Sequence, residues 1–330
     1  MDDISRQALA TAVGVIVAVY IALWMGLEQP YWAALSVMII SNTDRDALFT
    51  KGVLRVVGTI VGVTTGYVAA LWSEPLPPAQ LVLVALAAGI GTYGRQRSAY
   101  GYAWFYGALT FMLMIACAMT TPDQIYSFAW YRCYEIVIGV TVATLANWAI
   151  GPGEPSLPHR LVAQSTATTA ESALRQSAIG ALGVATIVIV WSLFNLPQLV
   201  QVLISSLIII DANPAASRHR GWQRILGCII GGTTALAIIW IDAVHIWWWT
   251  ISMGLGVFTF ARMHLGKTPN AYIGTQSAIA LLVTMVGTGP PDSILPPIDR
   301  LIGIVIGVSI MTVLIWALNP RPAEPAKASA

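Results

Sequence analysis

Twelve runs of mainly apolar residues, separated by short polar loops, follow one another along most of the chain. A helix needs about 20 such residues to cross the hydrocarbon core of a bilayer. The 330 residues are 57% hydrophobic and 10% charged, and so few charges cannot cover the surface of a water-soluble protein. The sequence therefore predicts an all-α polytopic membrane protein with about 12 transmembrane helices. The expected segments are 8–26, 30–41, 52–73, 79–94, 99–120, 128–150, 176–194, 198–210, 222–241, 245–261, 270–288 and 298–318.

The basic residues are distributed unequally between the two sides that these segments define. An even number of crossings places both termini on one side. The loops on that side hold 15 of the 17 lysines and arginines, and the opposite side holds only Arg132 and Arg300. Because cytoplasmic loops of membrane proteins are rich in Lys and Arg, we expect both termini to be cytoplasmic. The net charge of +2 gives no indication of nucleic-acid binding.

The two halves of the sequence are related to each other. RVVGTIVGVTTG (55–66) aligns with RILGCIIGGTTA (224–235) at an offset of 169, and residues 132–152 align with 300–320 at an offset of 168. Each copy holds six segments, so we expect two parallel six-helix repeats around an axis along the membrane normal. The expected division is a first repeat over 1–150, a cytoplasmic linker over 151–175, a second repeat over 176–320 and a cytoplasmic tail over 321–330.

Arg55 and Arg224 each precede a Gly-x3-Gly pattern near the expected cytoplasmic boundary. Glycines four residues apart share one helix face and let two helices approach closely. One interpretation is a packing face with an arginine anchored at the membrane interface. The other is a pseudo-symmetric pair of arginines that binds an anion at the inner mouth of a pathway. The expected packing glycines are Gly58, Gly62, Gly227 and Gly231.

The fourth and tenth segments each end in a Gly-x-Gly pair, an aromatic residue and a basic residue. Arg97 and Arg262 are these basic residues, and Tyr93 and Tyr102 are aromatic residues close to the first of them. The bias of basic residues toward the cytoplasm explains part of this pattern. A mixed lining would also suit an aromatic carboxylate, with an arginine for the carboxylate and a ring face for the ring.

Glu135 is the acid placed most deeply in an apolar segment, and glycine stands at its equivalent in the second copy. An ion pair with Arg132, three residues earlier, is the structural interpretation. A protonatable group that couples transport to a proton gradient is the functional one.

The sequence carries no catalytic motif and no group of histidines or cysteines at metal-ligand spacing. The three cysteines, Cys117, Cys133 and Cys228, lie in apolar runs and are expected to be small core residues. We therefore expect neither an enzyme nor a cofactor.

The two copies of the R-x-x-G pattern that open the third segment of each half resemble the fusaric acid resistance (FUSC) and aromatic acid exporter family. The sixth segments, with Arg132 and Gly139 and their counterparts Arg300 and Gly307, resemble it too. The resemblance implies export of aromatic carboxylic acids across the bacterial inner membrane, driven by the proton gradient. It also implies a periplasmic membrane-fusion partner and the possibility of a homo-oligomer. The chain is also similar to plant anion channels built from six-span protomers.

The leading hypothesis is an inner-membrane exporter of aromatic or other small organic carboxylic acids. Arg55, Arg224, Arg97 and Arg262 would attract the anion, and Glu135 would couple its transport to protons. The second hypothesis is a passive organic-anion channel, which would use the same basic mouth without a coupling carboxylate. The third is a structural or assembly membrane protein that transports nothing.

Overall fold

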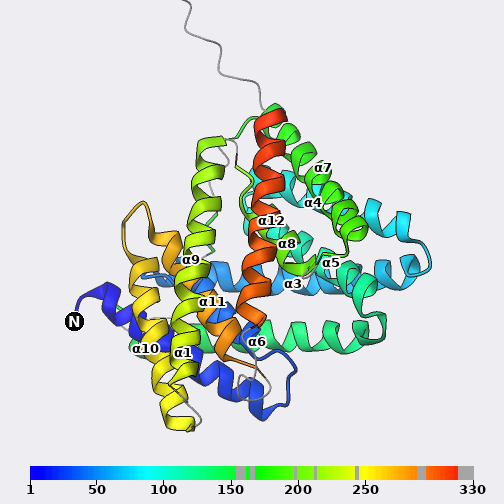
Figure 1. Cartoon of the computed structure of the whole chain (residues 1–330). Helices are drawn as coiled ribbons and strands as arrows, with labels where there is room; N and C mark the ends of the chain where they lie inside the picture. The colour runs from blue at the N-terminus through cyan, green and yellow to red at the C-terminus, as the bar shows by residue number, and fades with distance from the viewer. Residues whose placement is uncertain are drawn as a thin grey trace, which may run out of the picture.

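The computed structural model describes residues 1–153, 161–163, 168–196, 199–211, 214–241, 245–287 and 295–318. These residues form twelve α-helices and one short 3-10 helix, so the all-α architecture is confirmed (Figure 1). Part of the expected linker, 154–160 and 164–167, and the expected tail 321–330 lie outside the described residues. The helices are α1 (Asp3–Trp24), α2 (Tyr31–Ile40), α3 (Arg45–Ser73), α4 (Pro77–Arg97), α5 (Gly101–Thr120), η1 (Pro122–Gln124), α6 (Ile125–Ile150), α7 (Ala170–Phe194), α8 (Leu199–Ile208), α9 (Pro214–Trp240), α10 (Ile246–Leu265), α11 (Ala271–Met285) and α12 (Leu295–Leu318).

Among the described residues, eight helices are long and apolar enough to cross a membrane. They are α1, α3, α4, α5, α6, α7, α9 and α12. The equivalent helices α2 and α8 have only 10 residues each, and α11 has 15. At about 1.5 Å per residue, a ten-residue helix is about 15 Å long, half the thickness of the hydrocarbon core. The α2 and α8 helices are therefore too short to cross the core.

Several helices begin before their apolar run. The α3 helix begins at Arg45 rather than at residue 52, because the Asp44 carboxylate accepts hydrogen bonds from the backbone N–H groups of Asp46 and Ala47. The α7 helix begins after Thr169, whose hydroxyl accepts a hydrogen bond from the Ser172 backbone N–H. These side chains satisfy N–H groups that a helix start leaves unpaired. Hydropathy reports only the apolar part of a helix and misses such polar first turns.

Glycines at equivalent positions bring equivalent helices together in the two halves. Gly58 and Gly62 let α3 approach α5 so closely that a Cβ atom at either would collide with a backbone carbonyl of α5. Gly227 and Gly231 do the same between α9 and α11. The helix packing thus follows the internal repeat that the sequence shows.

The two halves are interlocked by their first helices. The α1 helix packs against α10, the fourth helix of the second half, and α7 packs against α4, the fourth helix of the first half. A Cβ atom on Gly254 would lie 3.0 Å from the Ile16 side chain, and one on Gly89 would lie 3.3 Å from that of Ala181. The Ser177 hydroxyl also donates a hydrogen bond to the Gly89 carbonyl, at 2.8 Å. The first glycine of each Gly-x-Gly pair therefore lies at a contact between the halves.

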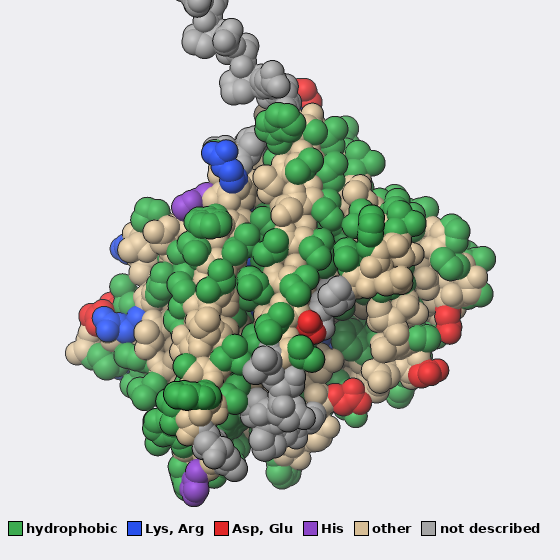
Figure 2. Space-filling view, in the orientation of Figure 1, with side chains coloured by type: hydrophobic (Ala, Val, Ile, Leu, Met, Phe, Trp, Pro, Cys, Tyr) green, Lys and Arg blue, Asp and Glu red, His purple; other side chains and the backbone are tan. Residues whose placement is uncertain are grey.

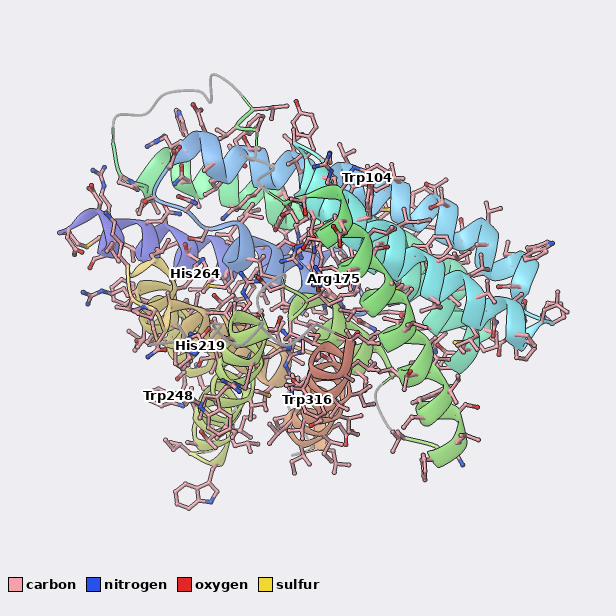
Figure 3. All side chains as sticks on the ribbon, turned by 90° about the horizontal axis from the view of Figure 1, so that it is seen from above. Trp104, Arg175, His219, Trp248, His264 and Trp316 are labelled. Atoms are coloured by element: carbon pink, nitrogen blue, oxygen red, sulfur yellow. The ribbon has the colours of Figure 1, made fainter. Side chains whose placement is uncertain are left out.

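The long helices of the two halves cross each other. In Figure 1, α3, α5 and α6 run across the view, whereas α9 and α12 run from bottom to top. Much of the surface in the same view is apolar, with charged side chains scattered toward its edges (Figure 2). Trp248 and Trp316 lie at the edge of the helix pack, with 43% and 70% of their surface exposed (Figure 3). An exposed apolar surface of this extent suits contact with lipid.

The adjacent glycines Gly231 and Gly232 provide a matched test of the α9–α11 contact. A Cβ atom at Gly231 would collide with the Ser277 carbonyl oxygen, whereas at Gly232 it would meet only Pro297 at 3.5 Å. Gly231→Ala is expected to destabilise the protein by about 1–3 kcal/mol, as overpacking does. Gly232→Ala should be neutral or slightly stabilising, because alanine favours helix. Thermal unfolding of the purified protein in detergent measures both, and equal midpoints would contradict the packing.

Candidate functional site

A cavity of about 250 Å³ lies where the two halves meet. Its walls come from α2, α4 and α5 of the first half and from α8 and α11 of the second. The lining combines apolar side chains with aromatic rings, one amide and one guanidinium. The polar and aromatic members are Arg95, Tyr102, Phe105, Tyr106, Tyr272 and Gln276.

The cavity follows the internal repeat, because equivalent residues line it from opposite sides. Ile39 and Ile208, near the C-terminal ends of the short helices α2 and α8, are equivalent at an offset of 169. Tyr102 on α5 and Tyr272 on α11 are equivalent at an offset of 170. A pocket on a repeat interface, beside short helices, is where substrate sites of repeat transporters occur.

Arg55 lies immediately behind this lining. Its side chain is 1% exposed, and its Cζ atom lies 4.1 Å from the centre of the Tyr106 ring. Its Nε atom donates a hydrogen bond to the Ser36 hydroxyl at 3.3 Å, while Nη1 has no hydrogen-bond partner among the described residues. The aromatic face stabilises the buried cation, and one donor is left for a further acceptor.

Arg224 has the equivalent place in the second half and is also 1% exposed. Its Nε atom donates to the Ser205 hydroxyl at 3.2 Å, as Arg55 does to Ser36. Its Nη1 atom donates to the Gln276 side-chain oxygen at 2.9 Å and to the Tyr272 hydroxyl at 3.5 Å. The structure thus brings the two predicted arginines to one cavity, each through a residue that lines it.

Arg95 is a cation of the cavity that sequence reasoning missed. It lines the cavity directly, its Cζ atom lies 5.0 Å from the centre of the Phe105 ring, and Nη1 donates to the Leu207 carbonyl at 3.4 Å. Arg97 was favoured because it aligns with a basic residue of the tenth segment. Because Arg95 and Arg97 are two residues apart on a helix, their side chains point to opposite sides. Helical periodicity is therefore the feature of the sequence that distinguishes them.

The other basic and aromatic candidates lie in different places. Arg97 is exposed and donates from Nη1 to the Thr168 carbonyl at 2.9 Å. Arg262 is exposed, with its Cζ atom 6.0 Å from the centre of the Phe258 ring. Tyr93 is also exposed, whereas Tyr102 lines the cavity and its hydroxyl has no hydrogen-bond partner among the described residues. Only Tyr102 of these four belongs to the cavity.

Glu135 lies on α6 beside Arg132, and the two residues are 2% and 3% exposed. The Glu135 Oε2 atom is 3.9 Å from Arg132 Nη1, and the Cζ atom of Arg132 lies 3.4 Å from the Trp32 ring centre. The other carboxylate oxygen, Oε1, has no hydrogen-bond partner among the described residues. Glu135 is the one buried acid of the described chain.

A larger groove of about 420 Å³ lies between α3, α4 and α5. Its walls are almost entirely apolar, with Val57, Val61, Leu86 and Ile90 among them, and no charged residue lines it. It offers no group that would select an anion, so we take the cavity between the halves as the candidate site. No cluster of three metal-ligating residues occurs in the described part of the chain.

Comparison with known proteins gives two matches to family models, one over each half. The model of the fusaric acid resistance protein family matches residues 5–187, more than half of the chain. The model described as fusaric acid resistance protein-like matches residues 181–320. No solved structure matches.

The chain is also similar to curated proteins named p-hydroxybenzoic acid efflux pump subunit AaeB. The one from Musicola paradisiaca is 25% identical over 158 residues, which is 44% of this chain and 24% of that protein. The one from Salmonella arizonae is 27% identical over 158 residues, with the same shares of each chain. The chain thus spans about a quarter of the length of these relatives.

Two substitutions in the cavity should affect stability in different ways. Gln276→Leu removes an acceptor from the buried Arg224 and is expected to cost about 2 kcal/mol, because the charged Nη1 donor then keeps only the hydrogen bond of 3.5 Å to the Tyr272 hydroxyl. Tyr102→Phe removes a hydroxyl without a partner among the described residues and should leave stability unchanged or raised. Unfolding of each purified variant in detergent checks this order, which the reverse ranking would contradict.

Proposed function

Because the chain belongs to the fusaric acid resistance protein family, and a cavity flanked by two buried arginines lies between its halves, we propose that it exports small organic carboxylates. We place it in the bacterial inner membrane as a multi-pass protein with both termini in the cytoplasm. The observation that carries the proposal is the equivalence of Arg55 and Arg224, which approach one cavity from opposite halves. Their burial makes a bound anion the natural complement.

The lining favours an aromatic carboxylate over other anions. Arg95 presents a guanidinium, which pairs with the two oxygens of a carboxylate. Tyr102, Phe105 and Tyr106 present rings that pack against an aromatic ring. The named relatives are subunits of pumps for p-hydroxybenzoic acid, a single-ring carboxylic acid, and this supports the same substrate class for this chain.

The exposed arginines have a different function in this proposal. Arg97 and Arg262 lie outside the cavity, at helix ends on the expected cytoplasmic side. Exposed cations raise the local concentration of an anion and are screened by salt. We propose that they attract the substrate to the cytoplasmic mouth without binding it in the cavity.

A further protein would complete the export path. The relatives are named as pump subunits, which supports a periplasmic membrane-fusion partner for this chain. Association of two or more copies of the chain is a separate proposal, which light scattering of the purified protein would test.

The driving force separates two candidate functions. In a proton-coupled exporter, Glu135 would be the group that takes up and releases the proton. In a passive anion channel, Glu135 would stay ionised as the partner of Arg132. Arg132 at 3.9 Å favours the ionised form of Glu135, whereas the burial of Glu135 favours the neutral form, so this geometry serves both functions.

The double variant Arg55→Gln, Arg224→Gln tests the transport proposal. Inverted membrane vesicles or proteoliposomes containing the wild-type chain should take up radiolabelled 4-hydroxybenzoate, because both guanidiniums stabilise the anion in the cavity. The double variant should lose at least about 90% of the uptake rate, equivalent to about 1.4 kcal/mol in the barrier.

The matched control is the double variant Arg97→Gln, Arg262→Gln, which removes the same charge outside the cavity. Its rate should fall only at low salt and match the wild-type rate at high salt, where the attraction is screened. Size-exclusion profiles confirm that both variants are folded. Wild-type uptake by a folded Arg55→Gln, Arg224→Gln variant would refute the proposal, and loss of a partner complex instead would support an assembly protein.

Glu135→Gln distinguishes the two driving forces. A proton-coupled exporter should lose accumulation against a gradient, because the variant cannot change protonation. A passive channel should keep downhill flux, and planar bilayer recordings should show unitary currents without a proton gradient. Accumulation by the variant that equals that of the wild type would exclude Glu135 as the coupling group.

A further inference from the structure

Arg132 on α6 and Arg300 on α12 are a second pair of buried arginines, 3% and 5% exposed, at an offset of 168. The sequence predicts a local ion pair with Glu135 for Arg132. The structure shows that they occupy equivalent places but have different neighbours, and the difference is in the charge around them.

The equivalence rests on helix packing as well as on sequence. The α6 helix packs against the short helix α2, and α12 packs against the short helix α8. A Cβ atom on Gly139 of α6 would collide with the Ala33 carbonyl oxygen, and one on Gly307 of α12 would lie 2.7 Å from that of Val202. Residues of α2 and α8 that are 169 apart therefore face the two arginines in the same way.

In the first half, Arg132 has an acid and two aromatic rings beside it, although its Nη1 atom has no hydrogen-bond partner among the described residues. Glu135 supplies a negative charge at 3.9 Å. The rings of Trp32 and Phe128 cover the guanidinium, with centres 3.4 Å and 5.4 Å from its Cζ atom. A buried arginine and aromatic rings are groups that hold a bound aromatic carboxylate, and here the carboxylate beside them is the protein's own Glu135.

In the second half, two of these three neighbours, Glu135 and Trp32, are replaced. Glycine (Gly303) stands at the position of Glu135, and Gln201 stands at the position of Trp32. Arg300 donates from Nη1 to the Gln201 side-chain oxygen at 2.9 Å, and its Nε atom has no partner among the described residues. No carboxylate of the described chain lies within ion-pair distance of Arg300. Gly303 thus leaves Arg300 without an internal anion, and Gln201 provides an amide where Trp32 provides a ring.

Arg300 also faces the contact between the halves. Tyr31, at the start of α2 in the first half, lies near both Arg132 and Arg300. Arg224, which donates to the cavity residue Gln276, is a like charge that repels Arg300. Both arginines are buried, and an anion beside them would reduce their mutual repulsion.

We propose that Arg300, with Gln201, forms a second binding station for a monovalent carboxylate, and that Glu135 fills the equivalent station of the first half from within the protein. The station deepens the proposed transport function and rests on it. Beyond the cavity the anion path is then one-sided: it runs past Arg300, while Glu135 in its ionised form neutralises Arg132. The carboxylate accepts hydrogen bonds from Arg300 and takes the place that Glu135 has beside Arg132.

Grafting the internal anion onto the second half tests the station. Gly303→Glu places a carboxylate three residues after Arg300, as Glu135 stands after Arg132. Gly303→Gln is the matched control, equal in size and without charge. In proteoliposomes, benzoate flux through Gly303→Glu should be at least about tenfold lower than through Gly303→Gln. Equal flux through the two folded variants would overturn the station.

A binding measurement keeps the test valid if both bulky side chains at the buried Gly303 prevent folding. Benzoate should raise the thermal unfolding midpoint of the wild type in detergent, because a ligand of the folded state stabilises it. Arg300→Gln should reduce this shift at least twofold, whereas Arg132→Gln combined with Glu135→Gln should leave it at the wild-type value. An equal reduction in both variants would overturn the asymmetry between the halves.

The two measurements separate the station from the transport proposal. Benzoate stabilisation that depends on Arg300, in a wild type without flux, would refute transport and support the station. If the wild type shows flux and Arg300→Gln keeps the wild-type thermal shift with benzoate, transport is supported and the station is refuted.

Discussion

The burial of guanidinium groups in an apolar helix bundle is the constraint on which this structure depends. Arg55, Arg132, Arg224 and Arg300 are at most 5% exposed, and Glu135 is the one buried acid among the described residues. A buried charge is costly unless a partner compensates for it. The Tyr106 and Trp32 rings, the Ser36 and Ser205 hydroxyls and the Gln201 and Gln276 amides supply part of this compensation. None of these groups carries a negative charge, so a bound anion would complete the compensation of the buried arginines.

The short helices make such an interior possible. The α2 and α8 helices have only 10 residues each, and buried arginines of neighbouring helices donate hydrogen bonds to their side chains. The serines that hold Arg55 and Arg224 lie on these two helices, at positions related by the repeat. The short helices thus both position the arginines and form part of the cavity wall.

The features of this arrangement that depend on local sequence patterns could be predicted. The features that depend on contacts between distant residues could not. The apolar runs and the repeat register predicted the helices and the pairing of Arg55 with Arg224, since both depend on local pattern. The alignment of the fourth and tenth segments selects Arg97 rather than Arg95. Helical phase places the two arginines on opposite sides of α4, but only the fold shows which side faces the cavity. The open surroundings of Arg300 could not be predicted either. They depend on Gln201, which is 99 residues away in the sequence and meets Arg300 only through the packing of α8 on α12.

The exchange of first helices between the halves has a consequence for the order of biosynthesis. The face of α1 that covers α10 has no partner until the ribosome has made the second half, and α4 is uncovered until α7 is inserted. Neither six-helix half is therefore a finished unit when it first reaches the membrane. Joining the halves in one polypeptide supplies the missing helix at a high effective concentration and makes the partner always the correct one. Two separate six-helix chains would have to find each other in the bilayer while those faces were exposed.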